Sequence, residues 1–474
     1  MILDLLQTVI DYGFLNSGIK LCQVQKNVYD DLYIYSISPI DYDYFHINQN
    51  VIEQKKFSRL KKLCMSDNNK INSVNHLSDT LLELDCSEQC TIEQNGISQL
   101  KHIQILNIHN NVNIYDLGHI NGTLVEITCG GSLFDNQSKI IKLTNIKKLD
   151  ISQCHNINNL DHLAKSLTYL DCSLSKIQNI ATLTNLTHLN CSGTSINQTS
   201  IGKLNHLKIL IMNHTDDIYD LNHLGGTLVE LHCKKTVMIQ QGMSNLKNIT
   251  YLDCYGCNSI FDVNHMKNLK YLDCGGEYNI IGNNGISQLR NLQVLKCHNN
   301  IHLSDISTLS NTLVKLYCSG HYCAIDQNGI MELKCLRKLD CYNNEKINNV
   351  NHLDKTLEKL FCSTGLHHNG GIDQKGIQDL TNLTVLDCSF NKHIYDVNHL
   401  VRLNRLYCCG DKCGIDQNGI QNLKNLKSLD MQFNTNINNI DIFKLDKLNC
   451  EKRTSIKKSD YNIDQKSPYI YLMW

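Results

Sequence analysis

The chain has 474 residues, with 45 Lys and Arg against 46 Asp and Glu, which gives a formal net charge of −1. This balance argues against bulk attraction to nucleic acid or to an anionic membrane, because proteins of both kinds normally carry a basic excess. The N-terminus lacks the basic flank and cleavage site of a signal peptide, and no run of eighteen apolar residues occurs. We therefore expect a cytoplasmic protein without nucleic-acid or membrane partners, whose 23 Cys remain thiols in a reducing compartment.

Residues 1–55 stand outside the repeat pattern that follows them, and the stretch 3–32 shows helical spacing of its apolar residues. Leu6, Val9 and Ile10 form a first apolar stripe, after which Gly13 can end the helix. A second apolar face follows, made of Ile19, Leu21, Cys22, Val24 and Val28. The spacing predicts a small helical N-terminal module over residues 1–55.

This N-terminal segment resembles a divergent F-box, although the usual Leu-Pro opening is absent. Leu6, Ile10 and Leu15 match the first half of the F-box pattern, and Leu21 and Val24 match the second. The resemblance implies that these five residues dock a Skp-type adaptor of a cullin-type ubiquitin ligase. The alternative interpretation is a helical cap that shields the open core of the first repeat, as solenoids require.

Residues 56–450 repeat a leucine-containing unit about 19 times, with a mean period of about 21 residues. The full form, L-x-x-L-x-C-x-x-N-x-x-I-x-x-V-x-x-L, occurs at residues 336–353 and 383–400. This array resembles the short, internalin-like class of leucine-rich repeat. The resemblance implies an α/β fold: a solenoid with a curved parallel sheet on the concave side, and 3₁₀ turns or short helices on the convex side.

Cysteine occupies the same strand position in 14 units, and in the other five units that position holds Met or Ile. A position that accepts Cys, Ile and Met alike is a packing position, because an unpaired thiol behaves as a small hydrophobe. Disulfides and a metal site are the alternatives, but paired C-x₂₋₄-C elements are missing and Cys409-x₃-Cys413 stands alone. We expect core packing, with no metal and no cofactor. The leucine-rich repeat resemblance implies that Cys154 and Cys257, which replace an Asn of the pattern, satisfy backbone groups.

Two forms of the unit alternate, one containing Asn-His-Leu and the other Gln-Asn-Gly-Ile, as at residues 94–97. The Gly of the second form is expected where the chain turns sharply. The His of the first form recurs with the repeat, so we interpret it as part of the structural pattern. No nucleophile elbow, phosphate loop or zinc-protease motif occurs, and we expect no catalytic residues and no enzyme activity.

The exposed positions of the predicted concave sheet combine Asp and Tyr side chains, which is typical of a protein-binding hot spot. The candidate partner-binding residues are Tyr169, Asp171, Tyr251, Asp253, Tyr255, Tyr271, Asp273, Tyr317, Asp340 and Tyr342. They would suit a partner that presents Arg or Lys. Alternatively, these Asp pair laterally with the flanking Lys148, Lys315, Lys338, Lys359 and Arg405 and only keep the sheet soluble.

The final segment, residues 451–474, is expected to form a C-terminal tail or cap that closes the last repeat. Two functions remain open. The chain is either an F-box and leucine-rich repeat substrate adaptor of a ubiquitin ligase, or a stand-alone protein-binding scaffold with no link to ubiquitin.

Overall fold

The computed structural model describes residues 33–37, 47–132, 134–365 and 370–450. The chain divides into two compact units, residues 1–228 and 229–474. The five residues predicted to dock an adaptor (Leu6, Ile10, Leu15, Leu21 and Val24) and the predicted tail at 451–474 lie outside the described residues. The predicted boundaries at 55/56 and 450/451 stay predictions.

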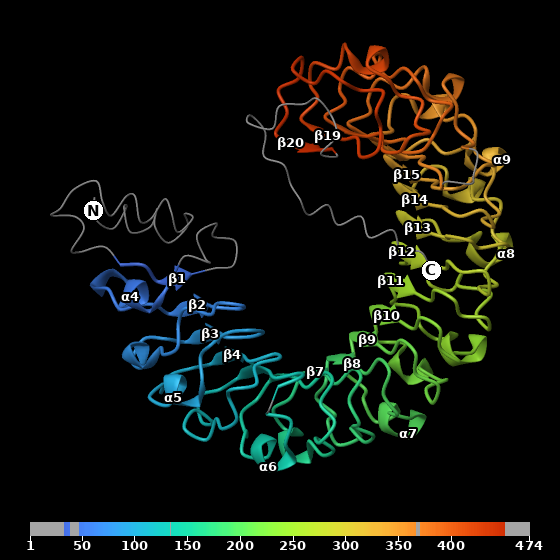
Figure 1. The fold of residues 1–474 in the computed structure, drawn as a ribbon. Coiled ribbons are helices and arrows are strands. Elements are labelled where there is room, and N and C mark those ends of the chain that lie inside the picture. Colours follow the sequence, from blue (N-terminus) through green and yellow to red (C-terminus); the bar gives the residue numbers. More distant parts are fainter. Residues whose placement is uncertain (1–32, 38–46, 133, 366–369, 451–474) are drawn as a thin grey trace, which may run out of the picture. The chain divides into compact units, whose positions relative to one another are not determined.

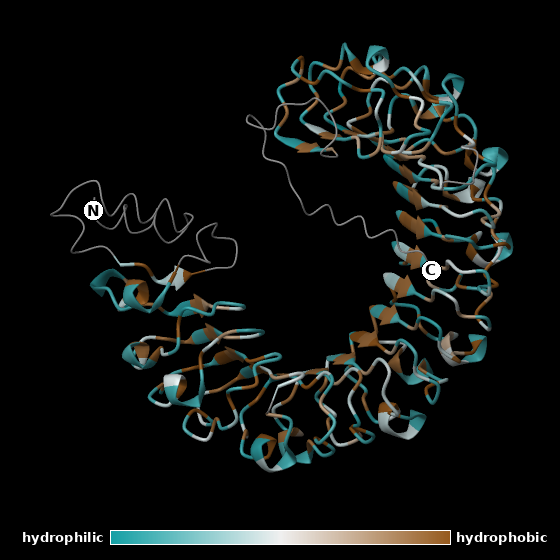
Figure 2. Cartoon of the chain, viewed as in Figure 1, coloured by the Kyte–Doolittle hydropathy of each residue, from teal (hydrophilic) through white to brown (hydrophobic). Residues whose placement is uncertain are grey.

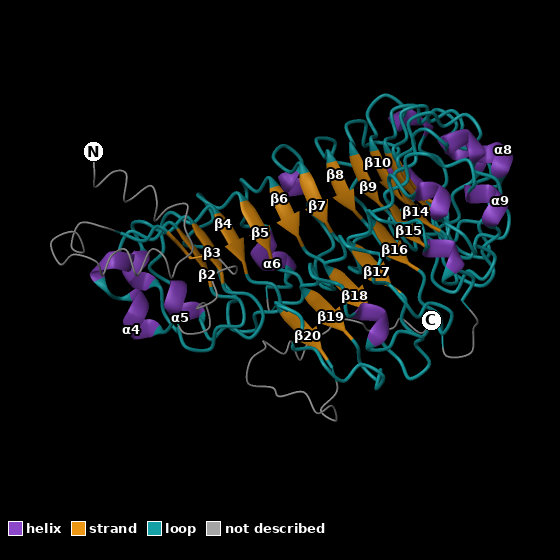
Figure 3. Cartoon of the chain, turned by 90° about the horizontal axis from the view of Figure 1, so that it is seen from above, coloured by secondary structure: helices purple, strands orange, loops and turns teal. Residues whose placement is uncertain are grey.

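Each repeat contributes a strand of three residues whose middle residue is apolar and buried, with one partly exposed side chain before it and another after it in most units. This alternation is the period-two pattern of a half-buried strand. In each unit the strands line one side and the short helices lie on the opposite side (Figure 1). The parallel array of strands is most easily seen in Figure 3.

The first unit contains a parallel sheet in which each strand pairs with the strand of the next repeat. Its strands are β1 (Ser36–Ile37), β2 (Lys62–Cys64), β3 (Glu83–Asp85), β4 (Ile105–Asn107), β5 (Glu126–Thr128), β6 (Lys148–Asp150), β7 (Tyr169–Asp171), β8 (His188–Asn190) and β9 (Ile209–Ile211). Strand β1 lies within the segment predicted as the N-terminal module, and it extends the sheet by pairing with β2.

The second unit repeats this arrangement with parallel pairing between successive strands. Its strands are β10 (Glu230–His232), β11 (Tyr251–Asp253), β12 (Tyr271–Asp273), β13 (Val294–Lys296), β14 (Lys315–Tyr317), β15 (Lys338–Asp340), β16 (Lys359–Phe361), β17 (Val385–Asp387), β18 (Arg405–Tyr407), β19 (Ser428–Asp430) and β20 (Lys447–Asn449). Because the register advances without slips, residues at one strand position form straight columns across the sheet.

The side opposite the strands carries single turns of helix. The α-helical turns are α4 (Gln49–Ile52), α5 (Gln94–Ile97), α6 (Gln137–Ile140), α7 (Gln198–Ile201), α8 (Asn283–Ile286) and α9 (Gln327–Ile330). The 3₁₀ turns are Lys55–Phe57, Asn75–Leu77, Asp161–Leu163, Asn222–Leu224, Gln240–Met243, Ser307–Leu309, Asn351–Leu353, Lys375–Ile377 and Asn418–Ile420. The described part of the chain contains no helix long and apolar enough to cross a membrane.

The core of each unit is made of the repeated Leu, Ile and Cys side chains, most of which are fully buried. Apolar residues therefore recur along the strands and on the inner sides of the turns (Figure 2). Parallel three-residue strands, 3₁₀ or short helical returns and a ladder of buried Leu confirm the predicted leucine-rich repeat solenoid.

The glycine of the Gln-Asn-Gly-Ile form has a different role from the one the sequence suggested. Gly96 lies inside the helical turn α5, and a Cβ there would lie 2.2 Å from the backbone oxygen of Asn72 in the preceding repeat. Gly285, Gly329, Gly376 and Gly419 have the same close approach. The expectation of a sharp turn was wrong at this position, because the glycine is needed for repeats to stack closely.

A left-handed residue stands two positions after the cysteine position in most units. Glycine fills it in some, such as Gly256 (φ 70°), whereas Leu174 (φ 57°), Lys235 (φ 49°) and Phe390 (φ 60°) hold it elsewhere. This residue turns the chain out of the sheet at the end of each strand.

Candidate functional site

The repeated cysteines form part of the core. Those at the shared position, which the structure places directly after each strand, are buried from Cys86 to Cys408, Cys450 is partly exposed, and all of them are free thiols. Burial raises the pKa of Cys191 to about 12, so the neutral thiol persists at physiological pH. The predicted packing role is confirmed. The described residues contain no cluster of His, Cys, Asp or Glu suited to a metal ion.

A second set of side chains donates hydrogen bonds to backbone carbonyls of the preceding repeat. The Asn111 amide donates to the carbonyl of Cys86 at 2.7 Å, and the Cys257 thiol donates to the carbonyl of Cys233 at 2.8 Å. Cys154 makes the equivalent contact with Cys129 at 3.7 Å, which confirms the role expected for Cys154 and Cys257. Sequence reasoning missed that Cys323 and Cys413 have this role too. Both stand five residues after a core cysteine, whereas Cys257 stands three after Cys254, and this longer spacing hid the equivalence in the sequence.

The His of the Asn-His-Leu form is also structural. Its Nε2 lies at hydrogen-bond distance from a backbone carbonyl of the preceding repeat, as for His352 and Ile330 at 3.0 Å. The same contact is made by His76, His119, His162, His223, His265 and His399. The predicted structural role of these His is confirmed.

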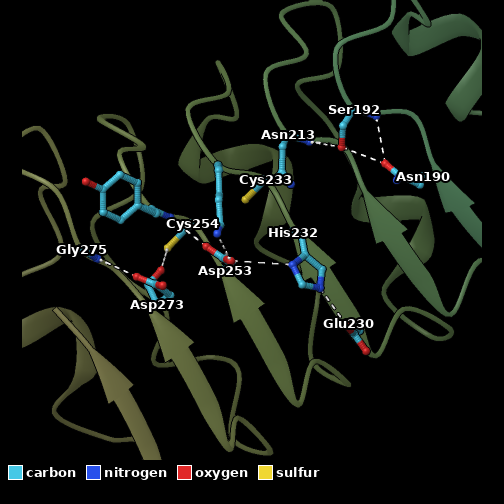
Figure 4. Close-up of polar contacts among 12 residues, drawn as sticks. Asn190, Ser192, Asn213, Glu230, His232, Cys233, Asp253, Cys254, Asp273 and Gly275 are labelled. Carbon is cyan, nitrogen blue, oxygen red and sulfur yellow. Dashed lines mark hydrogen bonds and ion pairs between the residues drawn. The ribbon is translucent and has the colours of Figure 1, made fainter. Parts of the chain in front are cut away.

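The Asp residues proposed for partner binding are less exposed than the sequence pattern suggested. The exposed fraction is 2 % for Asp253 and 6 % for Asp273. Their carboxylates accept the backbone N–H two residues later, at 3.4 Å from Tyr255 and 3.1 Å from Gly275 (Figure 4). Asp171 and Asp340 make the same contact with Ser173 and Tyr342. This column of Asp closes the turn after each strand, a role typical of Asp near turns.

The carboxylate of Asp253 is also paired with cationic groups. Lys234 Nζ lies 3.0 Å away and His232 Nδ1 lies 3.7 Å away, while His232 Nε2 lies 2.8 Å from Glu230 (Figure 4). Burial opposes ionisation, but His232 and Lys234 together hold the pKa of Asp253 below its ordinary value. At Asp273, burial and the charge of Asp253 raise the pKa to about 6. Asp253 is therefore held by an ion pair and a backbone hydrogen bond, and Asp273 by a backbone hydrogen bond.

The aromatic residues of the same face form a continuous strip across β10 to β16. The rings of Tyr251 and Tyr271 stack with centroids 4.0 Å apart, and the His232 ring lies 4.8 Å from that of Tyr251. Lys296 Nζ lies 5.4 Å from both the Tyr271 and Tyr317 ring centroids. Lys338 Nζ lies 4.6 Å from the Tyr317 ring centroid and 4.7 Å from the Phe361 ring centroid. The aromatic strip comprises His232, Tyr251, Tyr271, Lys296, Tyr317, Lys338 and Phe361.

The structure thus brings three of the predicted partner-binding residues of the second unit into one strip. Tyr251, Tyr271 and Tyr317 belong to the aromatic strip. Tyr255 lies in the turn after β11, where its ring covers Gly275, and Tyr342 lies in the turn after β15. Sequence reasoning missed His232, Lys296, Lys338 and Phe361, because their contribution depends on which strands are neighbours.

In the first unit, Tyr169 and Asp171 lie on β7 beside an open depression of about 570 Å³ over β4 to β8. The Tyr169 side chain is 38 % exposed, and its ring lies 5.9 Å from that of His188. An ion pair of 2.8 Å between Lys148 and Glu126 lines the depression. The partner-binding role of all ten predicted residues stays a prediction.

Comparisons with known proteins give similarities at the level of solved structures. No protein-family model and no curated protein sequence matches the chain. The functional domain of InlJ from Listeria monocytogenes, described as including a cysteine ladder, is 20% identical, with a TM-score of 0.45 over 76% of this chain and 75% of that chain. The leucine-rich repeat protein LIC12759 of Leptospira interrogans is 16% identical, with a TM-score of 0.43 over 86% of this chain and 97% of that chain.

A third similar structure is the ectodomain of the plant receptor kinase GASSHO1/SCHENGEN3 from Arabidopsis thaliana in complex with CASPARIAN STRIP INTEGRITY FACTOR 2. It is 14% identical, with a TM-score of 0.42 over 83% of this chain and 60% of that chain.

Proposed function

We propose that the chain is a protein-binding scaffold and that a partner docks on the sheet face of β10 to β16. The observation that carries this proposal is the aromatic strip, in which stacked rings and interleaved Lys ammonium groups line the open face of the sheet. Partly exposed Tyr next to charged groups is the composition that dominates binding energy in protein interfaces.

The geometry of the strip favours binding over a purely internal role. Cross-strand aromatic pairs stabilise a sheet by only about 0.2–1 kcal/mol each. The mutual contacts do hold the rings of Tyr251 and Tyr271 in one arrangement before a partner arrives. Side chains ordered in advance lose little conformational entropy on binding, so more of the contact energy appears as affinity.

Site-specific photo-crosslinking from the full-length chain tests the proposal. A benzoylphenylalanine at Tyr271 should capture a discrete partner in cell extract, and Tyr251→Ala in the same chain should reduce that capture several-fold. The matched control places the same group at Phe261, which is 53 % exposed in a loop after β11. Equal capture from both positions, or capture unaffected by Tyr251→Ala in a folded protein, would contradict the proposal.

The second candidate function is that of a substrate adaptor for a cullin-type ubiquitin ligase. The observation in its favour is the F-box resemblance of residues 3–32, in which Leu6, Ile10, Leu15, Leu21 and Val24 supply the matching apolar positions. In this case the N-terminal segment recruits the Skp-type adaptor and the sheet face selects the protein to be modified.

A pull-down of purified Skp-type adaptor by the full-length chain separates the two candidates. Leu6→Asp and Val24→Asp should each abolish retention if the F-box candidate is correct, whereas the neighbouring polar change Gln25→Asp should not. Absence of retention by the folded wild-type chain would leave the stand-alone scaffold. A lower melting temperature in the two Asp variants without any adaptor binding would indicate the capping role.

A further inference from the structure

Four basic residues occupy the first strand position in neighbouring repeats of the second unit. Lys315, Lys338 and Lys359 stand directly beside one another on β14, β15 and β16, and Arg405 follows on β18 after Val385 on β17. We call these four residues the basic column. With strands about 4.8 Å apart, the column spans about 19 Å.

The same strand position in the first unit is arranged differently. There, Lys62 pairs with Glu83 on the next strand, and Lys148 pairs with Glu126 on the preceding strand, both at 2.8 Å. Such alternation of charge is the ordinary way in which neighbouring strands accommodate ionised side chains, because like charges directly opposite destabilise a sheet. The second unit departs from it over three consecutive strands.

The described residues provide no ion pair for any member of the basic column. The nearby carboxylate of Glu358 pairs instead with Arg337 at 3.3 Å. The expectation that Lys315, Lys338, Lys359 and Arg405 pair laterally with Asp is therefore not met at these strands. Lys338 lies over the rings of Tyr317 and Phe361, whereas Lys315, Lys359 and Arg405 are exposed.

The Asp residues of the adjacent column are turned to other partners. Asp387 accepts the backbone N–H of Ser389 at 3.0 Å and the hydroxyl of Ser363 at 3.4 Å, and Asp340 accepts the backbone N–H of Tyr342 at 3.3 Å. Among the described residues, neither carboxylate forms an ion pair with a member of the basic column.

We propose that the basic column binds an extended acidic segment of a partner protein, rich in Asp and Glu. This inference rests on the proposed scaffold function and names the chemistry of what it binds. An extended chain rises about 3.4 Å per residue, so about six residues cover the 19 Å column, and alternate side chains face it. Lys315, Lys359 and Arg405 are exposed and available for such contacts.

The contacts of Lys338 disfavour a nucleic acid as the ligand. Single-stranded nucleic acids gain much of their affinity by stacking bases on exposed aromatic rings. Here the Lys338 ammonium already lies over the rings of Tyr317 and Phe361, at 4.6 and 4.7 Å. A column of four cations in a chain with a net charge of −1 also lacks the extended basic surface that phosphate backbones require.

Fluorescence anisotropy with a fluorescein-labelled hexaglutamate peptide tests the inference on the full-length chain at about 50 mM salt. Lys315→Glu/Lys359→Glu should weaken binding at least tenfold, and Lys315→Gln/Lys359→Gln should weaken it several-fold without introducing new charge. The matched control, Lys62→Glu/Lys148→Glu, changes the net charge equally at the same strand position and should retain wild-type affinity. Affinity should also fall steeply as salt rises.

The inference is overturned if the wild-type chain does not bind the peptide, or if both Glu double variants lose binding equally. It is also overturned if a twelve-residue oligothymidine binds more tightly than the peptide and loses binding in Lys315→Glu/Lys359→Glu, since a nucleic acid is then the better ligand. If crosslinking from Tyr271 succeeds but survives the Lys315→Glu/Lys359→Glu change, and the peptide does not bind, the scaffold function stands and the basic column has another role. If the peptide binds but no crosslink forms from Tyr271, the basic column binds acidic chains and docking at the aromatic strip is contradicted.

Discussion

The phenol rings of Tyr251 and Tyr271 lie 4.0 Å apart with an interplanar angle of 5° on the neighbouring strands β11 and β12. Parallel strands in register place identical positions of successive repeats side by side, so a residue type repeated in the sequence becomes a stack in the structure. The stack is the centre of the proposed binding face. Its contribution to folding can be measured separately from its contribution to binding.

A double-mutant cycle on Tyr251→Ala and Tyr271→Ala should give a coupling free energy of about 0.5–1.5 kcal/mol, the range for aromatic pairs. Each single change should lower the free energy of unfolding modestly, because both rings are partly exposed. Urea denaturation followed by circular dichroism measures these values. A coupling energy indistinguishable from zero would mean that the rings are adjacent without interacting.

Replacing Asp387 with Asn should stabilise the protein at alkaline pH. Burial raises the pKa of Asp387 from its ordinary 3.8 to about 6, so the native state binds a proton that the unfolded state releases. The associated stability is complete below about pH 4 and is lost as pH rises through about 6. Asp387→Asn should therefore gain on the order of 3 kcal/mol at pH 8 and nothing at pH 4.

Urea denaturation at pH 4, 6 and 8 checks this prediction. The exposed Asp411→Asn serves as the control for removal of one negative charge and should show no such pH-dependent gain. A stabilisation of Asp387→Asn that is the same at all three pH values would contradict the assigned titration.

The His side chains that contact the preceding repeat should make the protein sensitive to acid. Burial lowers the pKa of His162 and His352, whose Nε2 atoms lie close to the carbonyls of Ile140 and Ile330. A depressed pKa means that stability is complete above about pH 6.5 and is lost as pH falls through the lowered value. His162→Gln/His352→Gln should flatten the decline of the unfolding free energy between pH 6.5 and 5.

The exposed His206 provides the control for this pH profile, because His206→Gln should leave the decline unchanged. A profile that is equally steep in all three proteins would assign the acid sensitivity to other groups.

The left-handed turn position offers a test of backbone strain. Lys235 adopts φ 49°, a conformation that costs a non-glycine residue about 1 kcal/mol, so Lys235→Gly should raise the free energy of unfolding by about 0.5–1 kcal/mol. Gly256→Ala at φ 70° should lower it by about 1 kcal/mol. Gly226→Ala is the control, since it has open space around it. A lower free energy of unfolding for Lys235→Gly, or a higher one for Gly256→Ala, would refute the strain argument.

Thiol reactivity should follow burial. The partly exposed Cys335 should react quickly with Ellman's reagent in the native protein, whereas the buried Cys254 should react only on unfolding. Cys335→Ser should therefore reduce the rapid phase by one thiol equivalent, and Cys254→Ala should leave it unchanged. Loss of rapid-phase amplitude in Cys254→Ala would show that the core thiols are accessible.

The periodicity of the sequence was enough to predict the repeat fold and the burial of the cysteines. Both depend on local spacing, since each unit places its Leu and Cys on the core side of a strand irrespective of its neighbours. The role of Asp253 and Asp273 could not be obtained in this way. A carboxylate at an outward strand position was predicted to be exposed. The turn that follows instead folds over it and donates backbone N–H groups to it.

The contacts between lysines and aromatic rings on neighbouring strands could not be predicted from the sequence either. The sequence shows that Lys296 and Lys338 occur at strand positions, but it does not show which rings lie beside them until the pairing of β12 to β16 is known. The register of the strands also decides whether a lysine lies opposite a glutamate, as Lys62 does, or opposite another lysine, as Lys338 does. The proposed partner chemistry therefore comes from the register of the strands.

The hydrogen bonds from Asn111 to Cys86 and from Cys257 to Cys233 each run backwards by one repeat. A repeat consequently has its buried carbonyl satisfied only while the following repeat is folded. Truncation within the array should leave a terminal repeat with unsatisfied buried carbonyls, and unfolding should spread from it stepwise towards the N-terminus. Wherever the chain is cut, the last intact repeat therefore needs a capping segment.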